Sequence, residues 1–306
     1  MSDNIAALLY LKNKVHKLKN IALIMAVFST LLSIKFMFGG GISGSVVDGD
    51  SIAEIKIEGI IFEDAKRSEV LKELLEDDSV KAVIVNINSP GGGIVGSEIL
   101  FDELRKISSV KPMVVVMESV AASGGYMAAV ASDYIIAHNG TLTGSIGVLM
   151  ESPELTGLAD KIGVKFNMYK SSPLKGSPSP FEKSSPLVDR VIQDSINDSF
   201  LFFSDLVKER RGKKINPKLT NVVFDGRVFT GRQAIKAGLV DEIGGKDQAL
   251  KYLSTKNIDV KKLPVVEVKL FDEEDGFLGK FFGSFSWFSS VENSLNQGQR
   301  IMAIMR

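Results

Sequence analysis

The sequence contains no cysteine, only two histidines and no excess of charge of either sign. Without cysteine, the chain can form no disulfide, no thiolate nucleophile and no cysteine-based metal site. His16 and His138 alone cannot make a histidine-rich metal site, and they leave a serine–histidine triad few options. The 37 basic and 37 acidic residues give zero net charge, so no global field attracts nucleic acid.

The N-terminal region combines a lysine-rich front with a long apolar run. Residues 21–38 contain one charged residue, Lys35, and approach the minimum for spanning a bilayer, which takes roughly 17–25 residues. A cleavable signal peptide is the alternative, but residues 39–44 match a cleavage site only loosely. A buried core helix fits the flanking lysines and glycines less well. We predict a cytoplasmic segment 1–20, an uncleaved transmembrane anchor 21–38, and a linker 39–50 leading to the periplasmic or extracellular side.

Strand and helix patterns alternate from residue 51 onward. Residues 81–87 and 112–117 form mostly apolar runs, as in strands that are buried on both faces of a parallel sheet. Residues 68–76 and 96–107 have helical spacing. This alternation predicts βαβ units and an α/β fold, which binds ligands at the carboxyl ends of its strands. Further strands are expected at 52–59 and 133–137.

The second half of the chain continues the pattern around one irregular loop. A segment rich in proline and serine at 171–186 predicts this loop, and a long amphipathic helix follows at 187–211. Residues 276–290 are rich in phenylalanine, and we expect them to pack on the domain or a sister subunit rather than lie on a membrane surface. The other expected elements are helices at 155–162 and 246–253, strands at 165–169 and 265–270, and a turn, helix and strand within 225–245.

Ser123 lies between a β-branched segment and a helix-compatible segment, and Gly124 and Gly125 follow it. A strand, a tight turn and a helix start would place its Oγ beside free backbone N–H groups. A serine that only caps the helix is the competing interpretation. A glycine-rich turn at 88–93 offers further N–H donors for an acyl transition state, or is a simple connection. That turn lacks the lysine and the serine or threonine of a phosphate loop.

The base for such a nucleophile is less obvious. His138 follows a strand and precedes Asn139-Gly140, which suits a turn residue, and no carboxylate is evidently placed to orient it. A lysine acts as base only as a neutral amine, which requires desolvation. Lys170, Lys175 and Lys183 all lie in the loop region after Tyr169, and composition does not choose among them.

Four motifs occur in order: NSPGGG at 88–93, ASGGY at 122–126, GTLTGSIGV at 140–148 and GRVFTGRQAIKAGLVDEIGG at 226–245. Together they resemble the signal peptide peptidase A family, and the resemblance covers roughly residues 51–253. It implies a membrane-anchored serine–lysine peptidase in its short, single-domain form. It also implies a fold related to the Clp protease and crotonase superfamily, with repeated ββα units.

The resemblance implies Ser123 as the nucleophile and Lys175 as the general base. Ser145 matches a serine that orients the lysine amine, and Gly92 and Gly124 match the amides of the oxyanion hole. The base segment departs from the family pattern, because no tyrosine precedes its lysine, glycine replaces aspartate, and another lysine lies nearby. No metal or cofactor is implied, and family members assemble into rings in which neighbouring subunits help to form the active-site groove.

We therefore expect a peptidase domain at 51–263, followed at 264–306 by a strand and an aromatic-rich tail. The expected activity is endoproteolysis of remnant signal peptides and similar hydrophobic peptides at the outer face of the cytoplasmic membrane. The expected partners are peptide substrates, the lipid bilayer and further copies of the chain, with no nucleic acid. Two other classes share some of these features, a crotonase-type acyl-CoA enzyme and a non-catalytic membrane scaffold.

Overall fold

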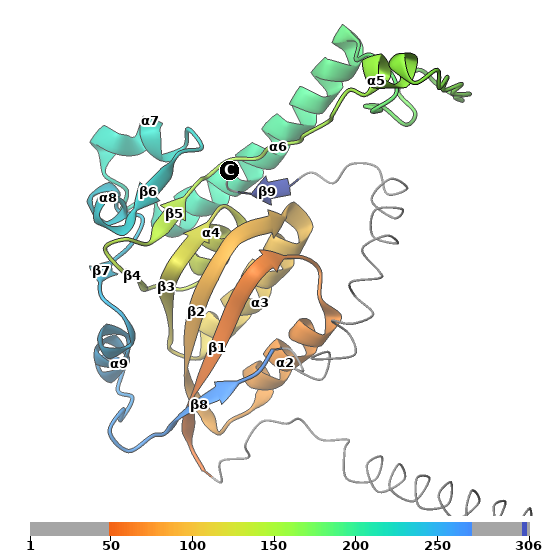
Figure 1. Ribbon diagram of the computed structural model, residues 1–306. Helices are drawn as coiled ribbons and strands as arrows, with labels where there is room; N and C mark the ends of the chain where they lie inside the picture. The colour runs from red at the N-terminus through yellow and green to blue at the C-terminus, as the bar shows by residue number, and fades with distance from the viewer. Residues whose placement is uncertain (1–48, 271–301, 305–306) are drawn as a thin grey trace, which may run out of the picture. The chain divides into compact units, whose positions relative to one another are not determined.

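The computed structural model describes residues 49–270 and the short strand at 302–304 (Figure 1). The expected basic segment 1–20, anchor 21–38 and tail 276–290 lie outside these residues and stay predictions. Among the helices within the described ranges, none is long and apolar enough to cross a membrane.

One sheet organises the described residues, and its main path runs β6-β5-β3-β2-β1-β8. The pairs along this path are parallel, except that β6 runs antiparallel to β5. Off the path, β4 pairs with β3 and β7, and β9 pairs with β2. The strands are β1 (Ser51–Ile61), β2 (Val80–Gly93), β3 (Met113–Ala122), β4 (Ile135–Ala137), β5 (Leu142–Gly144), β6 (Val228–Thr230), β7 (Glu242–Ile243), β8 (Val265–Val268) and β9 (Met302–Ile304).

Helices connect the strands and cover both faces of the sheet (Figure 1). They are α2 (Ala65–Glu76), α3 (Ile94–Val110), α4 (Gly124–Ala129), α5 (Thr156–Lys161), α6 (Pro186–Arg211), α7 (Thr220–Val223) after a short 3-10 turn, α8 (Gly231–Ala237) and α9 (Lys246–Ser254). Val83 and Val85 of β2 face the larger core, which α2, α3 and α4 share, whereas Ala82 and Ile84 face a smaller core with α9. Burial on both faces explains the continuous apolar runs. The predicted α/β fold is confirmed, and the repeated ββα units of a Clp or crotonase relative stay a prediction.

Two local predictions are wrong. The expected turn at 88–93 is an extended part of β2, because Gly91 and Gly92 continue the pairing with Ile60 and Ile61 of β1 after a register shift. The expected strand at 165–169 does not form, because this segment has no neighbouring strand within the described residues and lies in an exposed loop. Phe166 stacks instead on Phe181, which brings the two ends of that loop together.

The C-terminal end of α6 is fixed to the core. Arg211 is buried and forms an ion pair with Asp241 at 2.7 Å, and it also donates to the carbonyl oxygen of Gly238. Arg210 donates from Nε to the carbonyl oxygen of Val130 at the end of α4, at 2.9 Å. The N-terminal half of the helix extends away from the sheet toward α5 (Figure 1). We call residues 150–185 together with this half of α6 the arm.

Candidate active site

Ser123 occupies a strained turn between β3 and α4. Its φ of 53° and ψ of −121° lie where a residue with a Cβ is rarely found. Its backbone N–H donates to the Gly144 carbonyl at 2.8 Å, and its carbonyl accepts from Met127 N–H at 2.9 Å. These two bonds hold the turn on both sides and so maintain the strained conformation.

The Ser123 hydroxyl is not used structurally. The side chain is fully buried, its Oγ has no hydrogen-bond partner, and it makes no capping bond to α4. The helix-cap interpretation of this serine is therefore wrong. Because a buried hydroxyl without a partner destabilises the fold, such a group indicates a functional constraint.

Gly92 and Gly124 lie side by side next to this serine. A Cβ added to Gly124 would stand 3.2 Å from the backbone nitrogen of Gly92 and 2.1 Å from Oγ of Ser97. A Cβ added to Gly92 would stand 1.9 Å from the carbonyl oxygen of Ile61. Position 92 therefore requires glycine, and position 124 admits a Cβ only if Ser97 rotates and Gly92 shifts. The close approach of the two glycines brings together the two predicted oxyanion residues.

Ser145 lies at the same edge of the sheet as Ser123. Because β3 and β5 are parallel and Ala122 pairs with Gly144, the two serines follow neighbouring strand ends. Ser145 also has a positive φ, 49°, and its N–H donates to the Arg227 carbonyl at 2.8 Å. The backbone thus brings Ser123, Ser145, Gly92 and Gly124 to one place.

An extended segment pairs with the glycine-rich end of β2. Strand β9 runs antiparallel to it, with Gly91, Gly92 and Gly93 opposite Ile304, Ala303 and Met302. The edge that holds Gly92 therefore accepts an extended backbone. No motif in the sequence marked this pairing.

The loop that carries the candidate lysines lies away from Ser123 and the two glycines. Lys175 is exposed within two successive turns, in which its own N–H donates to Ser172 and Ser177 N–H donates to Leu174. The 26-residue α6 is about 39 Å long at roughly 1.5 Å per residue, and the loop lies beside its outer end, away from the sheet (Figure 1). Within one chain the structure does not bring Lys175 to Ser123.

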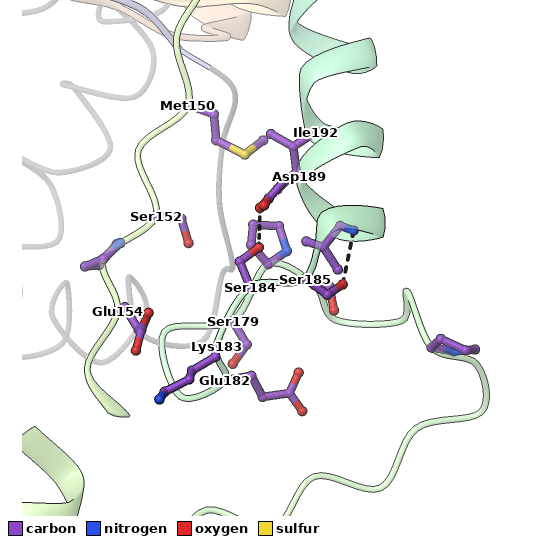
Figure 2. Close-up of a pocket in the computed structure, with 15 residues that line it drawn as sticks. Met150, Ser152, Glu154, Ser179, Glu182, Lys183, Ser184, Ser185, Asp189 and Ile192 are labelled. Atoms are coloured by element: carbon purple, nitrogen blue, oxygen red, sulfur yellow. Dashed lines mark hydrogen bonds between the residues drawn. The ribbon is translucent and has the colours of Figure 1, made fainter. Parts of the chain in front are cut away.

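Lys170 and Lys183 do not reach Ser123 either. Lys170 Nζ forms an ion pair with Glu182 and donates to Ser177 Oγ at 3.1 Å. Lys183 lines a cavity of about 450 Å³ between residues 150–154 and the first turns of α6 (Figure 2). None of the five predicted site residues lines this cavity, so the cavity belongs to the arm.

His138 is a turn residue, as its sequence position indicated. Its carbonyl accepts from Thr141 N–H at 3.2 Å, and its backbone N–H donates to Thr141 Oγ1 at 3.0 Å. The carboxylate of Glu118 lies 4.0 Å from its half-exposed imidazole, which the sequence did not reveal. Since Ser123 Oγ has no hydrogen-bond partner, the imidazole is not coupled to it.

Two serines near the site were not predicted from the sequence. Ser89 Oγ accepts from Gly91 N–H at 3.1 Å and so shapes the glycine-rich end of β2. Ser97 Oγ donates to the Gly93 carbonyl at 2.8 Å while lying against Gly124. The Ser-Pro-Gly order at 89–91 was a usable signal for the first, because serine hydroxyls often bond the backbone two residues onward. The second depends on contact between α3 and α4, which no local pattern predicts.

Comparison with known proteins identifies the family to which a chain with this site belongs. The model of Peptidase family S49 matches residues 105–261. A protein of Methanocaldococcus jannaschii named as a candidate protease is 32% identical over 84% of this chain and 87% of its own length. A candidate signal peptide peptidase SppA of Enterococcus faecium is 36% identical over 70% of this chain and 61% of its own length.

The chloroplast serine protease SPPA of Arabidopsis thaliana is 35% identical over 65% of this chain and 30% of its own length. These matches favour a peptidase over the acyl-CoA enzyme and the non-catalytic scaffold. The chain belongs to peptidase family S49 and is a serine peptidase of the signal peptide peptidase A family.

Proposed function

We propose that the chain is a membrane-bound endopeptidase that cleaves remnant signal peptides and similar hydrophobic peptides with a Ser123–Lys175 dyad. The observation that carries this proposal is the buried, unpartnered Ser123 hydroxyl beside Gly92 and Gly124. A hydroxyl kept free in a strained turn is available to attack a carbonyl, and neighbouring amides suit the oxyanion that forms.

In this mechanism Ser123 Oγ attacks the scissile carbonyl carbon while the neutral Lys175 amine accepts the hydroxyl proton. The amides of Gly92 and Gly124 donate to the oxyanion. Collapse of the tetrahedral intermediate breaks the C–N bond, and the lysine gives its proton to the leaving amine. A water molecule, deprotonated by the same amine, then attacks the acyl-enzyme carbonyl, and the lysine gives that proton to Ser123 Oγ as the C–O ester bond breaks. Ser145 accepts or donates a hydrogen bond that orients the amine.

The pairing of β9 supports an extended peptide as the ligand. A substrate that took the place of β9 along Gly91–Gly93 would form main-chain hydrogen bonds whatever its sequence. Such backbone recognition suits an enzyme that degrades peptides of varied sequence. The name of the Enterococcus faecium relative supports signal peptides as the substrate class.

The position of Lys175 supports assembly from several copies, in which the arm of one subunit reaches Ser123 of a neighbour. The arm leaves many large apolar side chains exposed, as an interface between subunits would require. They include Leu158, Ile162, Val164, Met168, Leu187 and Val191. Covering the arm would also remove water from Lys175, which favours the neutral amine that the mechanism needs. In a closed ring, every arm would contact its neighbouring subunit in the same way.

The apolar segment 21–38 with lysines in front supports a single-pass anchor, with the peptidase domain at the outer face of the cytoplasmic membrane. Remnant signal peptides are hydrophobic and remain in that membrane after cleavage, so an anchored enzyme would meet them where they accumulate.

The dyad is tested with purified, detergent-solubilised full-length protein and a synthetic signal peptide. We expect Ser123→Ala to lower kcat by at least about 10³-fold, and Lys175→Ala by nearly as much. The matched control is Lys165→Ala, an exposed lysine of the arm, which keeps wild-type turnover. Turnover that survives in Ser123→Ala would overturn the mechanism. Full activity in Lys175→Ala, together with loss in Lys170→Ala, would move the base to Lys170.

A further inference from the structure

We propose that Lys170 is a positioning residue whose ion pair with Glu182 closes the loop that presents Lys175. The proposal rests on the proposed function in one respect, since it takes Lys175 as the general base. It assigns Lys170, the nearest alternative base by sequence, a separate role that the structure supports directly.

Lys170 is the anchored lysine of this loop. Its side chain is only 14% exposed although it lies on a largely exposed arm. Its amine binds both the Glu182 carboxylate and Ser177 Oγ, at residues that follow Lys175 in the sequence. Lys175 by contrast is exposed and makes no ion pair within the described residues. One lysine is therefore committed to structure while the other is left available.

The ion pair is one of three ties that join the two ends of the loop. The rings of Phe166 and Phe181 stack with their centroids 3.8 Å apart. The N–H of Leu155 donates to the carbonyl oxygen of Pro180 at 2.7 Å. These ties converge on residues 180–182, so the chain between Lys170 and Glu182 forms a closed loop. Compact surface loops with closed ends of this kind often carry functional residues.

Closure of the loop matters for catalysis because Lys175 must meet a serine that is fixed in a rigid turn. An untied loop would spread Lys175 over many positions, and only a small fraction of them would place its amine beside a nucleophile. Loss of the tie would therefore slow the chemical step and leave peptide binding at the β2 edge nearly unchanged. The partly shielded position of Lys170 makes this pair more effective than one between two exposed side chains.

The ion pair also argues against Lys170 as the base. A general base needs a free lone pair within reach of the hydroxyl proton. The Lys170 amine binds the Glu182 carboxylate and the Ser177 hydroxyl, and it would have to break both interactions to act as a base. Ser177 and Glu182 are thus expected to affect Lys175 only through the shape of the loop.

The test compares kcat and KM of the full-length enzyme on a synthetic signal peptide. Lys170→Met and Glu182→Gln should each lower kcat about tenfold and leave KM within about twofold. Because both changes remove the same tie, the double variant should be no slower than either single variant. Lys170→Arg should restore at least half of the activity, since a guanidinium keeps the ion pair but cannot act as a base. Lys175→Arg should be inactive.

Three further readouts make the result decisive. The acidic limb of the pH profile of kcat/KM should keep its midpoint in Lys170→Met, because that substitution leaves the proposed base in place. The reversal Lys170→Glu with Glu182→Lys should recover activity that each single reversal loses. Lys165→Met, which removes an exposed lysine of the arm, should change neither kcat nor KM.

Wild-type kcat in both Lys170→Met and Glu182→Gln would overturn the positioning role. An inactive Lys170→Arg beside an active Lys175→Arg would make Lys170 the base and overturn it as well. Failure of the proposed function has a separate signature, because turnover would then survive in Ser123→Ala whatever stands at position 170.

Discussion

The strand-end site and the arm differ in burial and in packing. Around Ser123 the backbone is buried, and glycines allow contacts that no side chain could make. In the arm, a short helix and a loop expose large apolar side chains, and Tyr169 is 95% exposed. The strand-end site is fully packed within one chain, whereas the arm has an apolar surface that the rest of the described chain leaves exposed.

This difference indicates how the proposed dyad is divided. The nucleophile and the oxyanion glycines need fixed positions, and the core supplies them through strand pairing. The base must be neutral and therefore shielded from water, and one copy of the arm provides no such shield. The rigid half of the site is complete in one chain, whereas the other half depends on what the arm meets.

Apart from loss of the proposed dyad itself, the largest effect is expected from a single methyl group in the rigid half. Gly124→Ala would place a Cβ 2.1 Å from Ser97 Oγ and 3.2 Å from the Gly92 nitrogen, so the Ser97 side chain must rotate and the two proposed oxyanion residues must shift slightly apart. The amide at position 124 stays but is displaced from its proposed oxyanion position, so kcat should fall by about 10–10²-fold, and single-turnover kinetics would measure it. Gly140→Ala, at a glycine with no atom within 4 Å of an added Cβ, is the control and should be neutral. Near-normal kcat in Gly124→Ala would show that this glycine is not part of the site.

The sequence predicted those features of the two regions that depend on neighbouring residues. It did not predict those that depend on contacts between residues far apart in the chain. The core strands were predictable because apolar runs such as residues 81–87 reflect burial on both faces, which is a local signal. The glycine-rich end of β2 was mistaken for a turn because glycine usually breaks strands. Here its role is close approach to Ile61, a contact over more than thirty residues that leaves no local trace.

The site shows the same division. Ser123, Ser145 and the two glycines occur in short motifs, and parallel pairing of β3 with β5 then brings the serines together. The base was ambiguous because three lysines share one polar loop. Only the contacts of Lys170 with Ser177 and Glu182, which join residues seven and twelve positions apart, separate it from Lys175.

The second prediction is that the serine and the lysine of one active site come from different copies of the chain. Ser123→Ala and Lys175→Ala proteins are mixed, dissociated and reassembled, and peptide turnover is measured. If the arm acts on a neighbour, random mixing of equal amounts restores about a quarter of the sites, because each site needs one intact serine and one intact lysine from separate chains. If both groups act within one chain, turnover stays at the level of the inactive variants. The control is reassembled wild-type protein, whose recovery sets the full scale.

The smallest expected effect is on stability, and it compares two tyrosines, one from each region. Tyr126, on α4 beside the site, is fully buried and donates to the Leu239 carbonyl at 2.9 Å. Tyr126→Phe leaves that buried carbonyl unpaired and should lower the free energy of unfolding by about 1–3 kcal/mol. Tyr169→Phe, in the exposed arm, should change it by less than about 0.5 kcal/mol. Urea unfolding of the two variants measures both values, and equal effects would remove the contrast between core and arm.

The Tyr126 phenol also makes the stability of the core depend on pH. Burial raises the pKa of Tyr126 above its ordinary value of 10.0, so the folded state favours the protonated phenol. The resulting stabilisation is fully present below pH 10 and is lost as the pH rises above it, because only the unfolded chain ionises readily there. Tyr126→Phe should therefore flatten the alkaline fall in stability, which urea unfolding at several pH values would measure. An unchanged slope in Tyr126→Phe would mean that the α4 interior opens to water before the chain unfolds. In that case Ser123, three residues earlier in the sequence, would lose the dry surroundings on which the comparison with the arm depends.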